Sequence, residues 1–171
     1  MAYTYSKLAT YTVGSSGITS VSFLNIPQNY TDLLVRISAR ITRPGTSTDI
    51  MNVSFNGTST NESCRRFESN GSNVSSATNS LLLAYNANGT GATANTFGNG
   101  ELYIPNYTGS NYKSFSNEGV AENNATTAYM GMAANLWSNT APINSITFTP
   151  DSGTDFVQYS TFYLYGIKAE V

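Results

Sequence analysis

The sequence predicts an all-β protein, folded as an antiparallel β-sandwich of about eight to ten strands. Runs that alternate between apolar and polar residues recur along most of the 171 residues. No apolar stripe at helical spacing accompanies them. Clusters of Gly, Asn, Ser and Pro separate the runs, as turns do in a sandwich. Because no linker or internal repeat divides the chain, we expect one domain over residues 1–171.

The clearest predicted strand runs from Thr31 to Thr42. Apolar residues from Leu33 to Ile41 fall at every second position, as in a half-buried strand, while Leu34 shares the other face with the polar residues. The sequence Arg43-Pro44-Gly45 then ends it. Three further strands are expected in this half, at Tyr3–Val13, Val21–Phe23 and Met51–Phe55, and Asn56-Gly57 predicts a hairpin-type turn.

The middle of the chain predicts one short apolar strand, Leu81–Tyr85, between two long loops. These loops, Asn70–Ser80 and Asn86–Gly100, consist almost entirely of Gly, Ser, Thr, Ala and Asn. The remaining strands are expected at Leu102–Ile104, Tyr112–Val120, Tyr129–Trp137, Ile143–Thr149 and Asp155–Ile167.

Composition argues against several classes of function. The absence of histidine excludes most hydrolytic triads and histidine metal sites. Eight Lys and Arg residues against ten Asp and Glu give a net charge of −2, so no nucleic-acid partner is expected. No apolar run approaches the ~20 residues that span a bilayer, so no membrane partner is expected. Met1 to Val13 lacks the features of a secretory signal, so we expect folding in a reducing cytoplasm.

We expect no catalytic, cofactor-binding or metal-binding residues. The closest acid pairs in the sequence are Glu118 with Glu122 and Asp151 with Asp155, and a solvated turn accounts for the second. A weak calcium site in the turn between Asp151 and Asp155 is an alternative. Cys64 precedes two arginines that could activate its thiol, but without a histidine base a small, half-buried strand residue is the favoured interpretation.

All five arginines fall within one stretch of the chain. Arg36 and Arg40 are expected on one face of the predicted strand Thr31–Thr42, and Arg43 follows it directly. Arg36, Arg40 and Arg43 are therefore candidates for a contact with acidic groups of a partner protein. The alternative is an ordinary solvated face.

Aromatic residues give a second candidate interface in the last predicted strand. Tyr159, Tyr163 and Tyr165 alternate with Phe and Leu residues that suit the core. Tyrosine offers a large contact area with few rotatable bonds, so the Tyr face is expected to point outward or into a neighbouring chain.

Trp137 is the one tryptophan, and Asn135 and Asn139 lie close to it in the sequence. An aromatic ring beside amide groups can form a platform that stacks on sugar. A tryptophan in the core or at its rim is the alternative.

Three segments of the chain resemble small virion proteins of tailed bacteriophages. These are the opening Tyr5-Ser6-Lys7-Leu8-Ala9-Thr10-Tyr11-Thr12-Val13-Gly14, Tyr30 to Val35, and the closing Ile143 to Thr149 with Phe162 to Ile167. The resemblance covers most of the chain, and its motifs are structural. It implies a jelly-roll-like sandwich and a homo-oligomer, most often a trimer.

The resemblance implies a protein of the virion, assembled in the cytoplasm of a bacterial host. A non-enzymatic capsid decoration (cement) protein is expected, with the major capsid protein and further copies of itself as partners. The alternative is a receptor-binding module of a tail fibre or baseplate that recognises host-surface glycans through Trp137, Asn135 and Asn139.

Overall fold

The computed structural model describes residues 3–124 and 128–169, which form twelve strands and no helix. Within these ranges no helix is long and apolar enough to cross a membrane. The strands are β1 (Tyr3–Thr12), β2 (Val21–Phe23), β3 (Asp32–Ala39), β4 (Thr48–Phe55), β5 (Glu62–Ser69), β6 (Val74–Asn79), β7 (Leu82–Asn88), β8 (Gly98–Ile104), β9 (Lys113–Ala121), β10 (Tyr129–Trp137), β11 (Ile146–Pro150) and β12 (Thr161–Ala169).

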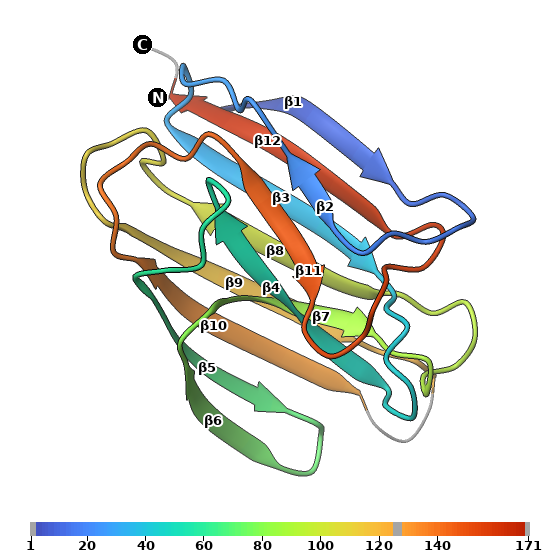
Figure 1. Cartoon of the computed structure of the whole chain (residues 1–171). Helices are drawn as coiled ribbons and strands as arrows, with labels where there is room; N and C mark the ends of the chain where they lie inside the picture. Colours follow the sequence, from blue (N-terminus) through green and yellow to red (C-terminus); the bar gives the residue numbers. More distant parts are fainter. Residues whose placement is uncertain (1–2, 125–127, 170–171) are drawn as a thin grey trace.

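The strands form two antiparallel sheets that pack face to face (Figure 1). The large sheet has the order β1-β12-β3-β8-β9-β10-β5-β6, and the small sheet has the order β2-β11-β4-β7. Eight strands pair in a nested manner: β1 with β12, β2 with β11, β3 with β8, and β4 with β7. This nesting, four strands in each sheet, is the jelly-roll topology, so the predicted fold class is confirmed.

Four additional strands widen only the large sheet. β9 and β10 follow β8 in the chain, β5 and β6 follow β4, and all four continue the large sheet beyond β8. In Figure 1 the β5–β6 hairpin extends beyond the small sheet at the lower end. The outward side of this extension therefore gives the protein a broad sheet surface that an eight-stranded jelly roll lacks.

The main core lies between the sheets and holds buried aliphatic and aromatic side chains from both. Phe55 contacts Trp137 and Phe115, and Phe162 contacts Phe148 and Phe156, with ring centroids 5.0–5.5 Å apart. A smaller cluster of Cys64, Leu83, Tyr85 and Ala133 lies where β7 crosses the extension. The extension is thus packed through Phe115 and Trp137 of the main core at one end and through this smaller cluster beside β7.

Three glycines let β7 lie directly against the extension. Gly100, Gly119 and Gly131 are cross-strand neighbours in β8, β9 and β10. A Cβ atom at Gly119 would lie 2.3 Å from the backbone of Tyr85 and Asn86, and one at Gly100 would lie 1.9 Å from the Tyr85 carbonyl. No side chain fits in this space, so the row must be glycine.

The structure confirms most predicted strands, and Tyr129–Trp137 agrees at both ends. The loop prediction for Asn70–Ser80 is wrong, because Val74–Asn79 forms the edge strand β6. The predicted loop Asn86–Gly100 is shorter, since β7 and β8 extend into it from both sides. The last strand begins at Thr161 and not at Asp155.

Two predicted features differ in detail. Asn56 and Gly57 form the expected tight turn, with φ of 54° and 71° and the Thr58 amide donating to the Phe55 carbonyl. The turn nevertheless leads from β4 in the small sheet to β5 in the large one, so it joins no hairpin. The strand predicted at Thr31–Thr42 ends as β3 at Ala39, and Arg40 and Ile41 continue it only as isolated bridges.

Candidate functional site: the outer face of the large sheet

The candidate site is the outer face, which we define as the side of the large sheet turned away from the small sheet. A row of cross-strand neighbours crosses it from β12 to β5. In order along this row, the residues are Tyr163, Arg36, Glu101, Glu118, Met132 and Phe67. The outer face therefore changes from aromatic and charged at one end to apolar at the other.

The apolar end exposes four large side chains. Met130 is 57% exposed, Phe67 47%, Met132 46% and Val120 44%. They line a shallow depression of about 380 Å³, here called the methionine groove. Apolar patches of this kind on a folded surface mark contact sites for partners, and methionine adapts its shape to what it contacts.

The backbone of the glycine row forms part of the methionine groove. Gly100, Gly119 and Gly131 form its floor. The residues directly before and after each glycine, such as Glu118 and Val120, form its walls. The same glycines admit β7 on the inner side. One sequence feature therefore creates both the close contact inside and the depression outside.

Two carboxylates border the methionine groove. Glu101 and Glu118 are direct cross-strand neighbours. The Arg36 Nε atom lies 2.9 Å from Glu101 Oε2 and forms an ion pair with it. Within residues 3–124 and 128–169, the exposed Glu118 carboxylate has no hydrogen-bond or ion-pair partner. The row thus holds two anionic groups and one cation.

The structure brings together three of the six predicted interface residues. Arg36, Tyr163 and Tyr165 lie on the outer face, where Tyr163 neighbours Arg36. The opposite faces of the same strands carry Phe162 and Leu164, which are buried as expected. Tyr159 is exposed, but it lies in the turn before β12 with φ of 72°, so it does not share the face of Tyr163 and Tyr165.

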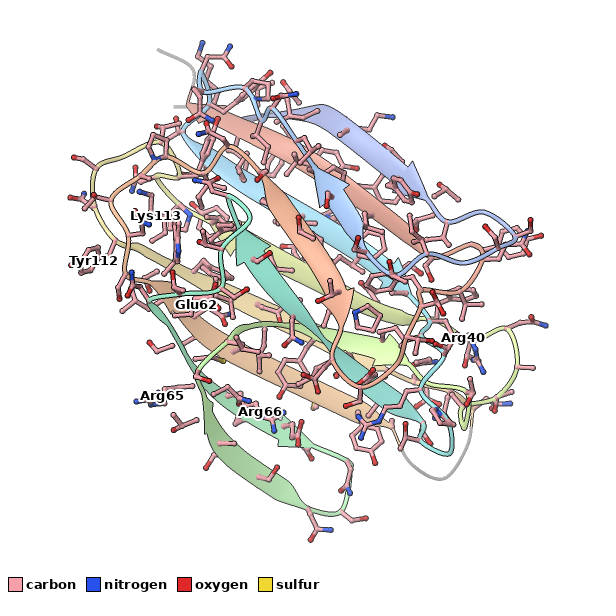
Figure 2. All side chains as sticks on the ribbon, viewed as in Figure 1. Arg40, Glu62, Arg65, Arg66, Tyr112 and Lys113 are labelled. Atoms are coloured by element: carbon pink, nitrogen blue, oxygen red, sulfur yellow. The ribbon has the colours of Figure 1, made fainter. Side chains whose placement is uncertain are left out.

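The expectation that Arg40 contacts a partner is corrected. Its guanidinium donates to the carbonyls of Ala92, Thr93 and Thr96 at 2.9–3.1 Å, and so holds the loop between β7 and β8. Figure 2 shows Arg40 beside this loop, away from Arg65 and Arg66 on β5. The sequence cluster of arginines is therefore not a cluster in space.

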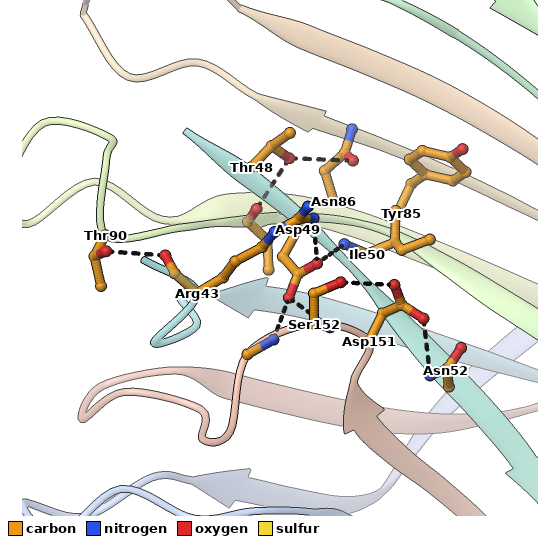
Figure 3. A network of polar contacts seen from close by, with 12 residues as sticks. Arg43, Thr48, Asp49, Ile50, Asn52, Tyr85, Asn86, Thr90, Asp151 and Ser152 are labelled. Atoms are coloured by element: carbon orange, nitrogen blue, oxygen red, sulfur yellow. Dashed lines mark hydrogen bonds and ion pairs between the residues drawn. The ribbon is translucent and has the colours of Figure 1, made fainter. Parts of the chain in front are cut away.

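The same expectation is corrected for Arg43. Its Nη1 atom lies 3.0 Å from the Oδ1 atom of Asp49, a carboxylate that is fully buried. Asp49 also accepts hydrogen bonds from the amides of Ile50, Ser152 and Gly153 (Figure 3). Arg43 thus neutralises a buried charge that fastens the turn after β11 to β4.

The predicted sugar contact at Trp137 is corrected as well. Trp137 is 1% exposed and packs edge-on against Phe55, so it offers no ring to a sugar. Asn135 is equally buried and bonds to the backbone of β7. Asn139 is partly exposed, and its Oδ1 atom accepts the Ala141 amide. These three residues form no common surface.

The remaining candidates from the sequence lie in a turn or in the core. Asp151 accepts from the side chains of Asn52 and Ser152, and Asp155 accepts from Thr154, as in a solvated turn. No group of three potential metal ligands from His, Cys, Asp and Glu occurs in the described part of the chain. Cys64 is buried, and burial raises the pKa of its thiol despite the opposing effect of Arg66 and Arg65.

A row with two ionisable side chains, the buried Lys113 and the half-buried Glu62, crosses the inner side of the extension. Lys113, Trp137 and Glu62 are cross-strand neighbours in β9, β10 and β5. Lys113 donates to the carbonyls of Gly109 and Ala141 at 2.5 and 2.8 Å, and burial lowers its pKa. Burial raises the pKa of Glu62 to about 7. Figure 2 labels Lys113 and Glu62 at the same end of the extension.

Sequence reasoning missed the methionine groove, although its signal was present. Met130, Met132, Ala134 and Leu136 share one face of β10, and this face is the more apolar. Such a face is expected to be buried. It points outward because the opposite face carries Gly131 and Asn135, which β7 requires.

Among known proteins, no family model, no curated protein and no solved structure matches the chain.

Proposed function

We propose that this protein is a non-enzymatic capsid decoration protein of a tailed bacteriophage, which binds the outside of the assembled shell through its outer face. The observation that carries the proposal is the exposure of Phe67, Val120, Met130 and Met132 on one broad sheet. A partner that covers these side chains removes their apolar area from water, which favours association.

The charged and aromatic end of the outer face supports the same proposal. Tyr163, Tyr165 and Arg36 belong to residue types enriched at protein interfaces, and they lie on the same sheet surface as the methionine groove.

Binding alone accounts for how such a protein acts. Contacts that exist only in the assembled shell stabilise that shell by mass action. A homotrimer, as the sequence resemblance implies, would hold three such faces together and raise the overall avidity without additional chemistry. The partners would be the major capsid protein and two further copies of this chain.

Shell binding tests the proposal directly. Purified protein is incubated with phage shells assembled without it, the shells are sedimented, and the bound fraction is measured. We expect saturable uptake at a fixed ratio to the major capsid protein. Met132→Asp should reduce uptake strongly because it places a charge in the contact. The matched control is Leu24→Asp, which alters an exposed leucine outside the large sheet.

Two results would overturn the proposal. One is the absence of uptake by the wild-type protein together with binding to host cells or their polysaccharides, which would favour the receptor-binding function. The other is equal uptake of the Met132→Asp and wild-type proteins, which would exclude the outer face. Light scattering gives the oligomeric state, and a monomer at micromolar concentration would contradict the trimer.

A further inference from the structure

We propose that the methionine groove binds an arginine side chain of the partner protein. The guanidinium group would lie against Glu118, and the methylene stem would lie along Met132 and Phe67. The inference rests on the proposed binding function and adds the chemistry of the partner.

The charge of the outer face favours a cation beside Glu118. Glu101 and Glu118 face each other across β8 and β9. Like charges in this position repel, and Arg36 offsets only one of them through its 2.9 Å ion pair with Glu101. The second carboxylate is exposed and unpaired within the described ranges. A partner that supplies a cation there relieves the repulsion.

The apolar surface next to Glu118 favours a ligand that also has an apolar part. Met132 is the direct cross-strand neighbour of Glu118, and Phe67 is that of Met132. A ligand that reaches Glu118 along this row therefore crosses two exposed apolar side chains. Long basic side chains have this form, with an aliphatic stem and a charged head.

Arginine suits this site better than lysine. Its planar guanidinium can form two parallel hydrogen bonds with a carboxylate such as that of Glu118. It is also more weakly hydrated than an ammonium group, so less free energy is lost when it enters a partly apolar groove. A wholly apolar segment would leave Glu118 covered and unpaired, which is unfavourable.

Methyl NMR of the protein can test this inference without shells. Met130 and Met132 report from the methionine groove, and the buried Met51 is an internal reference. The two probes are acetyl-Leu-Arg-Leu-amide and the same peptide with citrulline, the neutral isostere of arginine. We expect both groove methyl signals to shift with the arginine peptide at millimolar concentration, while the Met51 signal stays in place.

The charge contribution is measured by comparing variants. Glu118→Gln should weaken arginine-peptide binding about two- to fivefold, the effect of an exposed ion pair. It should leave citrulline-peptide binding unchanged, and added salt should reduce the preference for arginine. Asp151→Asn is the matched control, because it removes one exposed negative charge outside the large sheet and should have no effect.

Equal affinities for the two peptides, no effect of Glu118→Gln, or no shift of the groove methyl signals would each overturn the inference. The result is separable from that of the shell experiment. Uptake by shells without a preference for arginine would leave the decoration function standing and remove the arginine site. A preference for arginine without uptake by shells would leave the arginine site standing and remove the decoration function.

Discussion

The side chain of Asn135 forms two hydrogen bonds with the backbone of Leu83, as a neighbouring strand would. The Asn135 Oδ1 atom accepts from the Leu83 amide at 2.9 Å, and its Nδ2 atom donates to the Leu83 carbonyl at 3.1 Å. In β9, the Asn117 side chain accepts from the Tyr85 amide. In the other direction, the Asn86 side chain of β7 donates to the Gly119 carbonyl of β9. Asparagine side chains thus satisfy the free edge of β7 inside the protein.

Asn135→Ala should therefore destabilise the protein by about 2–4 kcal/mol, because it leaves two buried backbone groups without partners. The measurement is the free energy of unfolding in urea. Ala134→Ser is the control, since this neighbour is exposed on the outer face and should change stability by less than about 0.5 kcal/mol. Equal stabilities of the two variants would show that the amide contacts contribute little.

This use of asparagine explains what the sequence could and could not predict. Alternation identified β10 because every second residue of Tyr129–Trp137 faces inward. It could not identify the inward face, since the face that carries Asn135 and Gly131 is the less apolar one. That choice depends on β7, a strand more than forty residues away in the sequence, and no local pattern records it.

The edge strand β6 was missed for a related reason. Val74–Asn79 contains mostly Ser, Ala, Thr and Asn, which resemble a loop in composition. Its side chains are almost all exposed, and β5 supplies its backbone partners. A strand that packs against nothing on either face has no hydrophobic pattern to detect. In contrast, the alternating apolar residues of β3 were plain in the sequence, and Leu33, Val35 and Ile37 are buried.

Gly119→Ala should separate β7 from the extension. The added methyl group would lie 2.3 Å from backbone atoms of Tyr85 and Asn86, which cannot move aside as a side chain can. We expect a loss of about 3 kcal/mol in the free energy of unfolding, at the upper end of the cost of overpacking. Gly14→Ala is the matched control, because a Cβ atom at Gly14 would have free space around it. Apart from its two chain neighbours, no atom of the described residues lies within 4 Å of that position. An unchanged midpoint of thermal unfolding for Gly119→Ala would contradict the close contact.

Arg40→Ala should loosen the loop between β7 and β8 without affecting shell binding. The guanidinium donates to three carbonyls of this loop, so its removal leaves them to water. We expect a loss of about 1–3 kcal/mol and faster hydrogen exchange at the Ala92 and Thr96 amides. Arg36→Ala, which removes an exposed ion pair, should cost less than about 1 kcal/mol and reduce uptake by shells. Reduced uptake of Arg40→Ala by shells, with its stability unchanged, would instead support Arg40 as a partner contact.

Glu62 should make the protein less stable as the pH rises from about 4.5 to about 7. Its Oε2 atom accepts from the Leu82 amide at 3.3 Å, and its buried Oε1 atom has no hydrogen-bond partner in the described ranges. Burial raises its pKa in the folded protein from 4.5 to about 7, so between these values the folded state binds more protons than the unfolded state. The free energy of unfolding must therefore fall with rising pH across this window and level off above it.

Glu62→Gln isolates this contribution, because the amide does not titrate. We expect the variant to gain about 1–2 kcal/mol relative to the wild type between pH 5 and pH 8, allowing for the solvent that reaches the group. Urea unfolding at the two pH values gives the difference directly. Glu118→Gln is the control, since it removes one exposed carboxylate that makes no hydrogen bond or ion pair within the described ranges. Parallel pH profiles for wild type and Glu62→Gln would mean that Glu62 ionises in the folded protein as it does in water.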